Sequence, residues 1–560
     1  MKKTSKYLVY LFACLVVYSS CDSYLDRAPE LPLDDETVFT IFSNAERYHN
    51  DIYAHLTARF NAVGDYQPVP LSSASDESDS PLGSHGTYNF NIGNYDGVDA
   101  NLSYYQGIRK ANIFLKNAGV VPFPSEEKKK QMLGETCFLR AFYFNEIVKR
   151  FGGMPIMDES RIIMPGENKN YPRDSYKKCV DFILNDLEKA ITNLPVTLPE
   201  NEYGRATKGA AMALKARVLL FAASPQWQNE MGEDLWLKAA EAAKAVIDLT
   251  DKGEKVYQLY STGNAADDYE QLFFKRREHG NREIIFYKHA SPVGYNDNEI
   301  KVWSPKGGKF GGDGAVCPTQ NFVDLFEMAN GKLITENASS YNSQNPYANR
   351  DPRFYKIVLY NGSTWQGETL DLTYNPDQQK SGANRKNKTD YTRTGYYVRK
   401  YLPEGVKYQT TNTAYHNWIY FRLAEMYLNY AEAMNETFGP DNDNGFGLTA
   451  RQAVNIVRSR SGVTSIIANN KEEMQKRIWN ERAIELSFEE HRWWDARRWQ
   501  KATNWFGGSM YEMEITKEGN NLTYNKKPFY TRVYESYMDL YPIPLDEMRK
   551  NPLYVQNLDW

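Results

Sequence analysis

The sequence predicts a mainly α-helical protein in which tetratricopeptide-like helix pairs form a scaffold and irregular, loop-rich segments with short strands form a separate ligand face. Three observations predict this class. Amphipathic helical patterns fill residues 101–250 and 416–500, with a shorter stretch at 36–60. Stripes of alanine in the first of these regions would let neighbouring helices approach closely. Segments 64–100 and 280–415 are instead rich in Gly, Asn, Ser, Asp and Tyr.

The composition excludes several classes of protein. The chain has 560 residues, of which 41% are hydrophobic and 25% charged, and these fractions exclude a disordered chain, a collagen and a polytopic membrane protein. The formal net charge of −4 leaves no basic excess to neutralise phosphates, so no nucleic-acid partner is expected. The 41 tyrosines outnumber the 26 phenylalanines and 11 tryptophans together, which leaves amphipathic rings for ligand surfaces.

The N-terminus predicts an exported, lipid-anchored protein. Three lysines precede a 12-residue apolar run that is too short to span a membrane and is typical of a secretory signal peptide, predicted here as residues 1–20. Cys21 follows Ser19-Ser20 in a pattern that resembles a bacterial lipobox, so we expect Cys21 to be acylated. The alternative is an ordinary signal peptide followed by a chance cysteine.

Helix signals can be placed in order along the chain. Residues 126–151 carry an apolar face at spacings of three and four, with Ser125 as the N-cap and Gly152-Gly153 as the stop. Further helices are predicted at 173–193, from Thr207, at 235–249 and at 418–436, followed by a helix that Gly462 ends. No clean 34-residue period is present, so an ordinary helical bundle remains an alternative to tetratricopeptide-like stacking.

No known catalytic or metal motif is present, and no cofactor is expected. H-E-x-x-H, G-x-S-x-G and Walker A sequences are all missing from the chain. The mature chain keeps Cys137, Cys179 and Cys317, which make no disulfide framework and no C-x-x-C.

The most acidic helical segment is 477–499, where Glu481 and Glu485 stand one turn apart as a glycosidase pair would. Arginines lie within one turn of its acids, and opposite charges lower carboxyl pKa values, whereas a general acid needs a raised one. We therefore interpret this segment as an ion-paired structural helix. A second acidic cluster, Asp76, Glu77 and Asp79, is interpreted as a solvated loop, with a polar ligand contact or a calcium site as alternatives.

An ordered series of motifs resembles one family, the SusD/RagB-like outer-membrane nutrient-binding lipoproteins of Bacteroidetes. The series spans nearly the whole mature chain. One departure is Glu490, which stands where the family often has Gly. The motifs are CDSYLD (21–26), YYQGIRKANIFL (104–115), FLRAFYFNEIVKRFGGMPI (138–156), RATKGAAMALKARVLLFAAS (205–224), DPRF (351–354), FRLAEMYLNYAEAMNE (421–436), VNIVRSRSG (454–462), NERAIELSFEEHRWWDARRW (480–499) and YPIPLDEM (541–548).

The resemblance implies a single SusD-like domain over residues 21–560, exposed at the cell surface and attached to the outer membrane by its lipid. It also implies that the protein is not an enzyme, and that it captures an oligosaccharide as the lid of a SusC-like TonB-dependent transporter. Surface glycoside hydrolases are candidate further partners. A peptide or glycopeptide binder, a glycoside hydrolase and a pure assembly scaffold remain alternatives.

Glycan sites need aromatic platforms beside polar groups, because sugars have an apolar face and a fringe of hydroxyls. Rigid scaffolds commonly carry such binding residues on loops. We therefore predict carbohydrate contacts among the loop-borne rings and their polar neighbours. The predicted residues are Asp76, Tyr88, Asn89, Asn91, Tyr95, Tyr295, Trp303 and Trp365.

Overall fold

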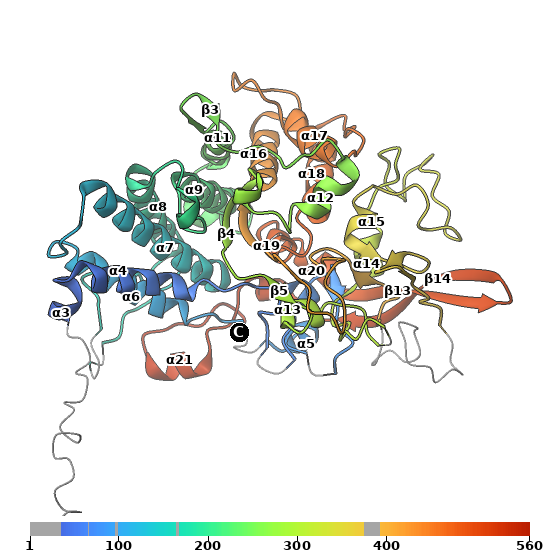
Figure 1. The fold of residues 1–560 in the computed structure, drawn as a ribbon, viewed down its shortest axis with the longest axis horizontal. Coiled ribbons are helices and arrows are strands. Elements are labelled where there is room, and N and C mark those ends of the chain that lie inside the picture. The colour runs from blue at the N-terminus through green and yellow to red at the C-terminus, as the bar shows by residue number, and fades with distance from the viewer. Residues whose placement is uncertain are drawn as a thin grey trace, which may run out of the picture.

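The computed structural model describes residues 35–64, 67–83, 85–95, 99–163, 167, 169–307, 309–374 and 392–560. The predicted signal peptide and Cys21 lie outside these residues. Within the described part, helices dominate the chain and the strands form small pairs (Figure 1). A short helix, α3 (Asp35–Phe39), comes first in the described chain. The longer helices are α4 (Phe42–Ile52), α6 (Tyr104–Asn117), α7 (Glu126–Phe151), α8 (Tyr176–Asn193), α9 (Lys208–Ala223), α11 (Trp236–Ile247), α16 (Leu423–Phe438), α17 (Ala450–Arg460), α18 (Lys471–Glu485) and α19 (His491–Arg498).

These helices pack in sequence order as the pattern predicts. Helix α6 contacts α7, α7 contacts α8, α8 contacts α9 and α9 contacts α11, which in turn packs on α16. The tetratricopeptide-like pairing is therefore confirmed, and the layers run across Figure 1 from α4 to α18. Helices α9 and α11 pack on each other, and the alanines of their stripes are almost fully buried.

The predicted helix boundaries are confirmed at several caps. Ser125 accepts a hydrogen bond from the backbone N–H of Lys128, and Gly152 ends α7 with a φ of 74°. Thr207 caps α9 in the same way, by accepting from the N–H of Ala210. Such caps satisfy backbone donors that the first helical turn would otherwise leave unpaired.

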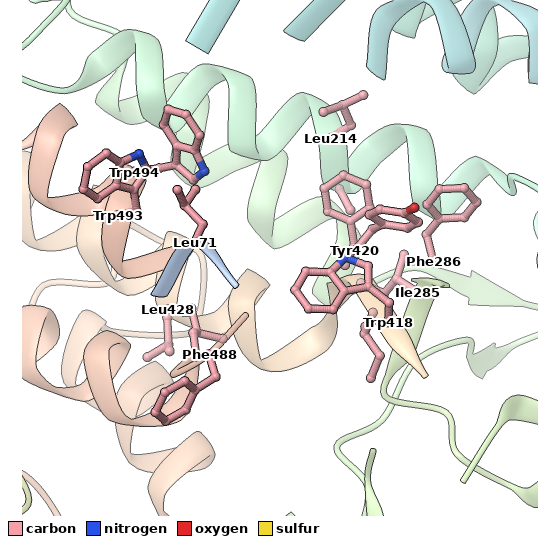
Figure 2. Packing of buried hydrophobic residues seen from close by; sticks show 14 of the residues in the cluster. Leu71, Leu214, Ile285, Phe286, Trp418, Tyr420, Leu428, Phe488, Trp493 and Trp494 are labelled. Atoms are coloured by element: carbon pink, nitrogen blue, oxygen red, sulfur yellow. The ribbon is translucent and has the colours of Figure 1, made fainter. Parts of the chain in front are cut away.

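Two helical predictions are corrected. The helix predicted over 418–436 begins only at Leu423, because Trp418–Arg422 form strand β12. Strand β12 pairs antiparallel with β4 (Ile284–Lys288). All five residues of β12 are buried, and their aromatic and β-branched side chains suit a strand covered on both faces. Figure 2 shows Trp418 and Tyr420 beside Ile285 and Phe286 in this packed region.

The segment 477–499 is likewise not one helix. Helix α18 ends at Glu485, and α19 begins at His491. Between them Phe488 and Glu490 have φ values of 58° and 66°, in the left-handed region that non-glycine residues rarely adopt.

The remaining elements form the irregular part of the molecule, together with one long hairpin that the sequence analysis did not predict. The strand pairs are all antiparallel: β1 (Ser78–Asp79) with β6 (Cys317–Pro318), β2 (Thr250–Asp251) with β3 (Glu254–Lys255), β5 (Val293–Gly294) with β11 (Thr413–Ala414), β7 (Val358–Leu359) with β10 (Tyr397–Val398), β8 (Thr364–Trp365) with β9 (Glu368–Thr369), and the hairpin β13 (Gly508–Glu518) with β14 (Asn521–Arg532). The short helices are α5 (Tyr88–Asn91), α10 (Gln228–Met231), α12 (Ala265–Gln271), α13 (Asn298–Lys301), α14 (Gln320–Val323), α15 (Phe354–Ile357), α20 (Ala502–Phe506) and α21 (Leu545–Lys550), with 3-10 turns η1 (Tyr53–His55), η2 (Leu71–Ala74), η3 (Glu200–Glu202), η4 (Arg277–His279) and η5 (Ser536–Asp539).

One hydrophobic core cluster joins the scaffold to the irregular segments. It includes Leu71 from η2, Phe488 from the break between α18 and α19, and Trp493 from α19. Figure 2 shows several of these side chains near one another. The loop-rich segments are therefore packed onto the helices over much of their length.

Candidate functional site

Four of the predicted platform rings belong to the core. Trp303 is 0% exposed, its indole N–H donates to Oδ1 of Asn61 at 2.9 Å, and its ring packs edge-on against Phe60. Tyr295 and Trp365 are equally covered, and the Tyr295 hydroxyl donates to the carbonyl of Phe310. The prediction that these three rings are exposed platforms for a sugar is therefore wrong, because other side chains cover them.

Tyr95 is the fourth buried ring. Its hydroxyl accepts a hydrogen bond from Nη2 of Arg497 at 3.2 Å, and its ring lies 6.4 Å from that of Trp493. Burial raises the pKa of Tyr95 to about 12. These contacts make Tyr95 part of the packing beneath α19.

The acidic cluster at 76–79 is buried, so its interpretation as a solvated loop is corrected. Asp76 is paired with Arg492, and Asp79 with Arg532, whose Nη2 lies 2.8 Å from Oδ2. Glu77 is fully covered, and its Oε1 accepts from the backbone N–H of Phe488 at 2.8 Å. Burial raises the pKa of Glu77 to about 8. The three carboxyls thus fix the loop to the scaffold.

The carboxyls of α18 are also structural. Glu481 pairs with Arg353 and Arg458, and Glu485 lies within 2.9 Å of Arg353. Although burial raises the pKa of Glu485, the neighbouring guanidiniums outweigh this effect and hold it well below its usual range. A carboxyl in this state cannot act as a general acid. Across the described ranges no group of three His, Cys, Asp or Glu is placed to hold a metal ion.

The exposed aromatic residues of the loop-rich part lie elsewhere. Tyr88, at the start of α5, is 42% exposed. On the neighbouring hairpin, the rings of Phe529 and Tyr530 lie 5.5 Å and 5.3 Å from the guanidinium of Arg393, measured to the ring centres. Burial raises the pKa of Tyr530, and the negative charge of Asp79 adds to this rise. The end of the hairpin is hydrogen-bonded to α5, because the N–H of Val533 donates to the carbonyl of Asn91 at 3.0 Å. We name Tyr88, Arg393, Phe529 and Tyr530 the Tyr88–Arg393 surface.

The Tyr88–Arg393 surface is held from below. Arg393 donates from Nη1 to the carbonyl of Ser80 at 3.2 Å, and its Nε lies 3.5 Å from Oδ1 of Asp79. Its side chain remains 23% exposed. The hydroxyl of Tyr530 is buried and has no hydrogen-bond partner within the described part of the chain. The surface therefore combines two half-buried rings, one exposed ring and a positioned guanidinium.

Helix α5 is attached to the end of the hairpin, and Figure 1 shows the two side by side. Asn91 is buried, its Nδ2 donates to the carbonyl of Ser73 at 3.1 Å, and its own carbonyl accepts from the N–H of Val533 at 3.0 Å. Asn89 is half-buried beside Tyr88. Of the eight predicted residues, only Tyr88 and Asn89 are accessible here.

The residues that sequence reasoning missed are Arg393, Phe529 and Tyr530. Their positions lie 300 or more residues from Tyr88 in the chain, so no local pattern could bring them together. Tyr408 is a second exposed ring, 40% exposed and 5.3 Å from the ring of Tyr295. The alternation of apolar and polar residues from Tyr511 to Thr516 was the available signal for the hairpin that carries two of the missed residues.

Comparisons with known proteins agree with the architecture. The sequence model of the SusD family matches residues 282–560, and a second model, described as starch-binding associating with outer membrane, matches residues 24–220. SusD-like protein P25 of Formosa agariphila is 23% identical over 99% of this chain and 98% of its own length.

Solved structures show the same fold. A SusD-like protein from Bacteroides fragilis is 29% identical, with a TM-score of 0.77 over 94% of this chain and 100% of its own. A SusD-like carbohydrate binding protein from the same species is 23% identical, with a TM-score of 0.72 over 92% of this chain and 100% of its own. Among the described helices, none combines the length and the apolar character that crossing a membrane requires.

Proposed function

Because the chain belongs to the SusD family, we propose that it binds an oligosaccharide at the Tyr88–Arg393 surface and passes it to a SusC-like TonB-dependent transporter. The observation that carries the proposal is the guanidinium of Arg393 against the rings of Phe529 and Tyr530, on a hairpin whose end is hydrogen-bonded to α5, where the ring of Tyr88 is exposed. The matched family description of starch binding at the outer membrane supports the ligand class.

The geometry suits a sugar for physical reasons. A pyranose ring offers an apolar face that stacks on an aromatic ring, and hydroxyls that accept from a guanidinium. Arg393 is fixed by Asp79 and Ser80, so its remaining donors lose little conformational freedom when a ligand binds.

We propose binding without catalysis. The acid pair that resembled a glycosidase site is buried in ion pairs, and Glu77, whose raised pKa would suit a general acid, is fully covered. A retaining or inverting glycosidase needs two carboxyls that reach the glycosidic bond. The Tyr88–Arg393 surface contains no carboxyl among its four residues.

We also propose that the protein is a surface-exposed lipoprotein of the outer membrane. The lipobox-like Cys21 follows a predicted signal peptide, and the second family model begins only three residues later. Acylation at more than one position would give a stable anchor, since a single chain holds only marginally. Mass spectrometry of the protein purified from membranes would detect the acyl groups on Cys21.

The binding proposal is tested by calorimetry with glycans selected on a glycan array. We expect Tyr88→Ala and Arg393→Gln each to weaken the best glycan by tenfold or more, which corresponds to about 1.4 kcal/mol. Tyr408→Ala is the matched control, because Tyr408 has nearly the same exposure on another loop. Unchanged affinity in both site variants, loss only in the Tyr408 variant, or capture of peptides with no glycan would each contradict the proposal.

A further inference from the structure

A pocket of about 370 Å³ lies on the helical side of the molecule, and its described lining comes from α6, α21 and residues 155–163, 167 and 169–171. Tyr105, Arg109 and Asn112 face it from α6, at the helical spacings of four and three that place them on one side. Tyr554, just beyond α21, and Tyr171 add two further rings. Figure 1 shows α21 below α6, on the side of the molecule opposite the hairpin of β13 and β14.

The walls of this pocket are held in place by hydrogen bonds between separate segments. The Tyr105 hydroxyl donates to the carbonyl of Pro155 at 2.9 Å, and Nδ2 of Asn112 donates to that of Met157 at 2.8 Å. Nδ2 of Asn551 donates to the carbonyl of Tyr171 at 2.9 Å. The pocket is therefore preformed, and its volume lies within the range of small-ligand sites.

The charges around the pocket are unequal. Its lining contains four cationic and two anionic side chains: Arg109, Arg161, Lys169 and Lys550 against Glu167 and Glu547. Both lysines are paired with these glutamates, at 3.0 and 2.7 Å. Arg161 lies 3.7 Å from Asp174 and stacks over the ring of Tyr171 at 5.0 Å.

Arg109 differs from these cations. Nε of Arg109 donates to the carbonyl of Ile163 at 3.3 Å, and no carboxylate of the described residues lies within ion-pair distance of its guanidinium. Its two terminal nitrogens are left for a ligand. A guanidinium fork presents parallel donors that match a carboxylate bidentately, and such charge-assisted bonds are stronger than neutral ones.

We propose that this α6–α21 pocket is a second binding site, which takes a carboxylate-bearing sugar residue, with the carboxylate on Arg109 and the sugar ring against the tyrosines. The sugar part of the assignment rests on the proposed function. The anionic part rests on Arg109 and the excess of positive charge. Three tyrosine rings around one unpaired guanidinium suit a hexuronate, which has an apolar face, hydroxyls and one negative charge.

The test is calorimetry on the whole protein with trigalacturonate and with the same trisaccharide after methyl esterification, which removes its charge. We expect trigalacturonate to bind and the ester to bind at least tenfold more weakly. Arg109→Gln should weaken trigalacturonate tenfold or more, and Tyr171→Ala, which removes a ring without an assigned hydroxyl bond, should also weaken it. Tyr408→Ala, which removes an exposed ring from a loop outside both sites, should leave this affinity within twofold and is the matched ring control.

Absence of trigalacturonate binding, equal binding of the ester, or unchanged affinity in both pocket variants would overturn the proposal. Binding of triglutamate without trigalacturonate would overturn the sugar assignment. The neutral glycan of the first experiment is titrated alongside. If Tyr88→Ala does not weaken the neutral glycan while Arg109→Gln still weakens trigalacturonate, the Tyr88–Arg393 proposal fails and the pocket proposal stands. If Tyr88→Ala weakens the neutral glycan while Arg109→Gln leaves trigalacturonate affinity unchanged, the pocket proposal fails and the Tyr88–Arg393 proposal stands.

Discussion

Asp76 and Arg492 form a bidentate ion pair that joins the loop-rich segment to helix α19. Nε of Arg492 lies 2.9 Å from Oδ1 of Asp76, and Nη2 lies 2.7 Å from Oδ2. The guanidinium also stacks over the ring of Trp505 at 4.0 Å, and both charged side chains are buried. Asp76 is thus occupied by the scaffold, although its sequence context predicted a ligand contact.

Asp76→Asn should lower the free energy of unfolding by about 3–5 kcal/mol, because it leaves the buried charge of Arg492 without its partner. Urea denaturation measures this change. Asp546→Asn is the control, since the Asp546–Arg549 pair is exposed and should contribute within about 0.5 kcal/mol. A variant that keeps its stability but loses glycan affinity would instead make Asp76 a ligand contact.

Trp303→Ala should destabilise the fold by about 3–5 kcal/mol, which is typical when a large buried ring is removed. The glycan affinity of the protein that remains folded should stay within twofold of the wild-type value. Thermal unfolding and calorimetry on the same samples measure the two quantities. The reverse pattern, with stability kept and affinity lost, would restore Trp303 as a platform ring.

The scaffold was largely predictable because its signals are local. The N-caps Ser125 and Thr207 and the stop at Gly152 each depend on a few neighbouring residues, and the structure has them as predicted. The strand at Trp418–Arg422 was missed because an unbroken apolar run has no period that separates a buried strand from a helix.

The site was predicted poorly for a different reason. Trp303 and Tyr88 share a loop-rich, polar sequence context, yet one is fully buried and the other is exposed. What separates them is tertiary packing by distant segments, such as Phe60 against Trp303. Arg393 gains its role only through Asp79 and Phe529, which no local window contains.

Substitutions at Glu490 separate two contributions to the free energy of unfolding: the strain of its left-handed backbone and its ion pair with Arg59. Its φ of 66° costs about 1–2 kcal/mol for a non-glycine residue, while its carboxylate lies 2.7 Å from Nε of Arg59. Glu490→Gly removes both effects, and Glu490→Ala removes only the ion pair. Because Arg59 keeps Asp99 as a partner, we expect the glycine variant to lose about 1–3 kcal/mol.

The alanine variant should be about 1 kcal/mol less stable than the glycine variant, because it keeps the left-handed strain. Urea denaturation of the three proteins gives this order. An alanine variant as stable as the glycine variant would show that the backbone at this position is not strained.

His416 gives the protein a stability that depends on pH. Its ring stacks on that of Phe60, with centroids 4.0 Å apart, and neither ring nitrogen has a hydrogen-bond partner within the described ranges. Burial lowers the pKa of His416 from its ordinary value of 6.5 to about 3. Between these two values the unfolded chain binds a proton that the folded protein excludes, so the free energy of unfolding falls as the pH falls from about 7 towards 3.

His416→Phe keeps a ring on Phe60 and removes this titration. We expect the loss of stability between pH 6 and pH 4 to be about 2–3 kcal/mol smaller in the variant than in the wild type, measured by urea denaturation at both values. The dependence should be reduced and not abolished, because burial also lowers the pKa of His49 to about 3. Equal losses in the two proteins would mean that His416 is protonated in the folded state, or that the ring leaves its buried position before pH 4 is reached.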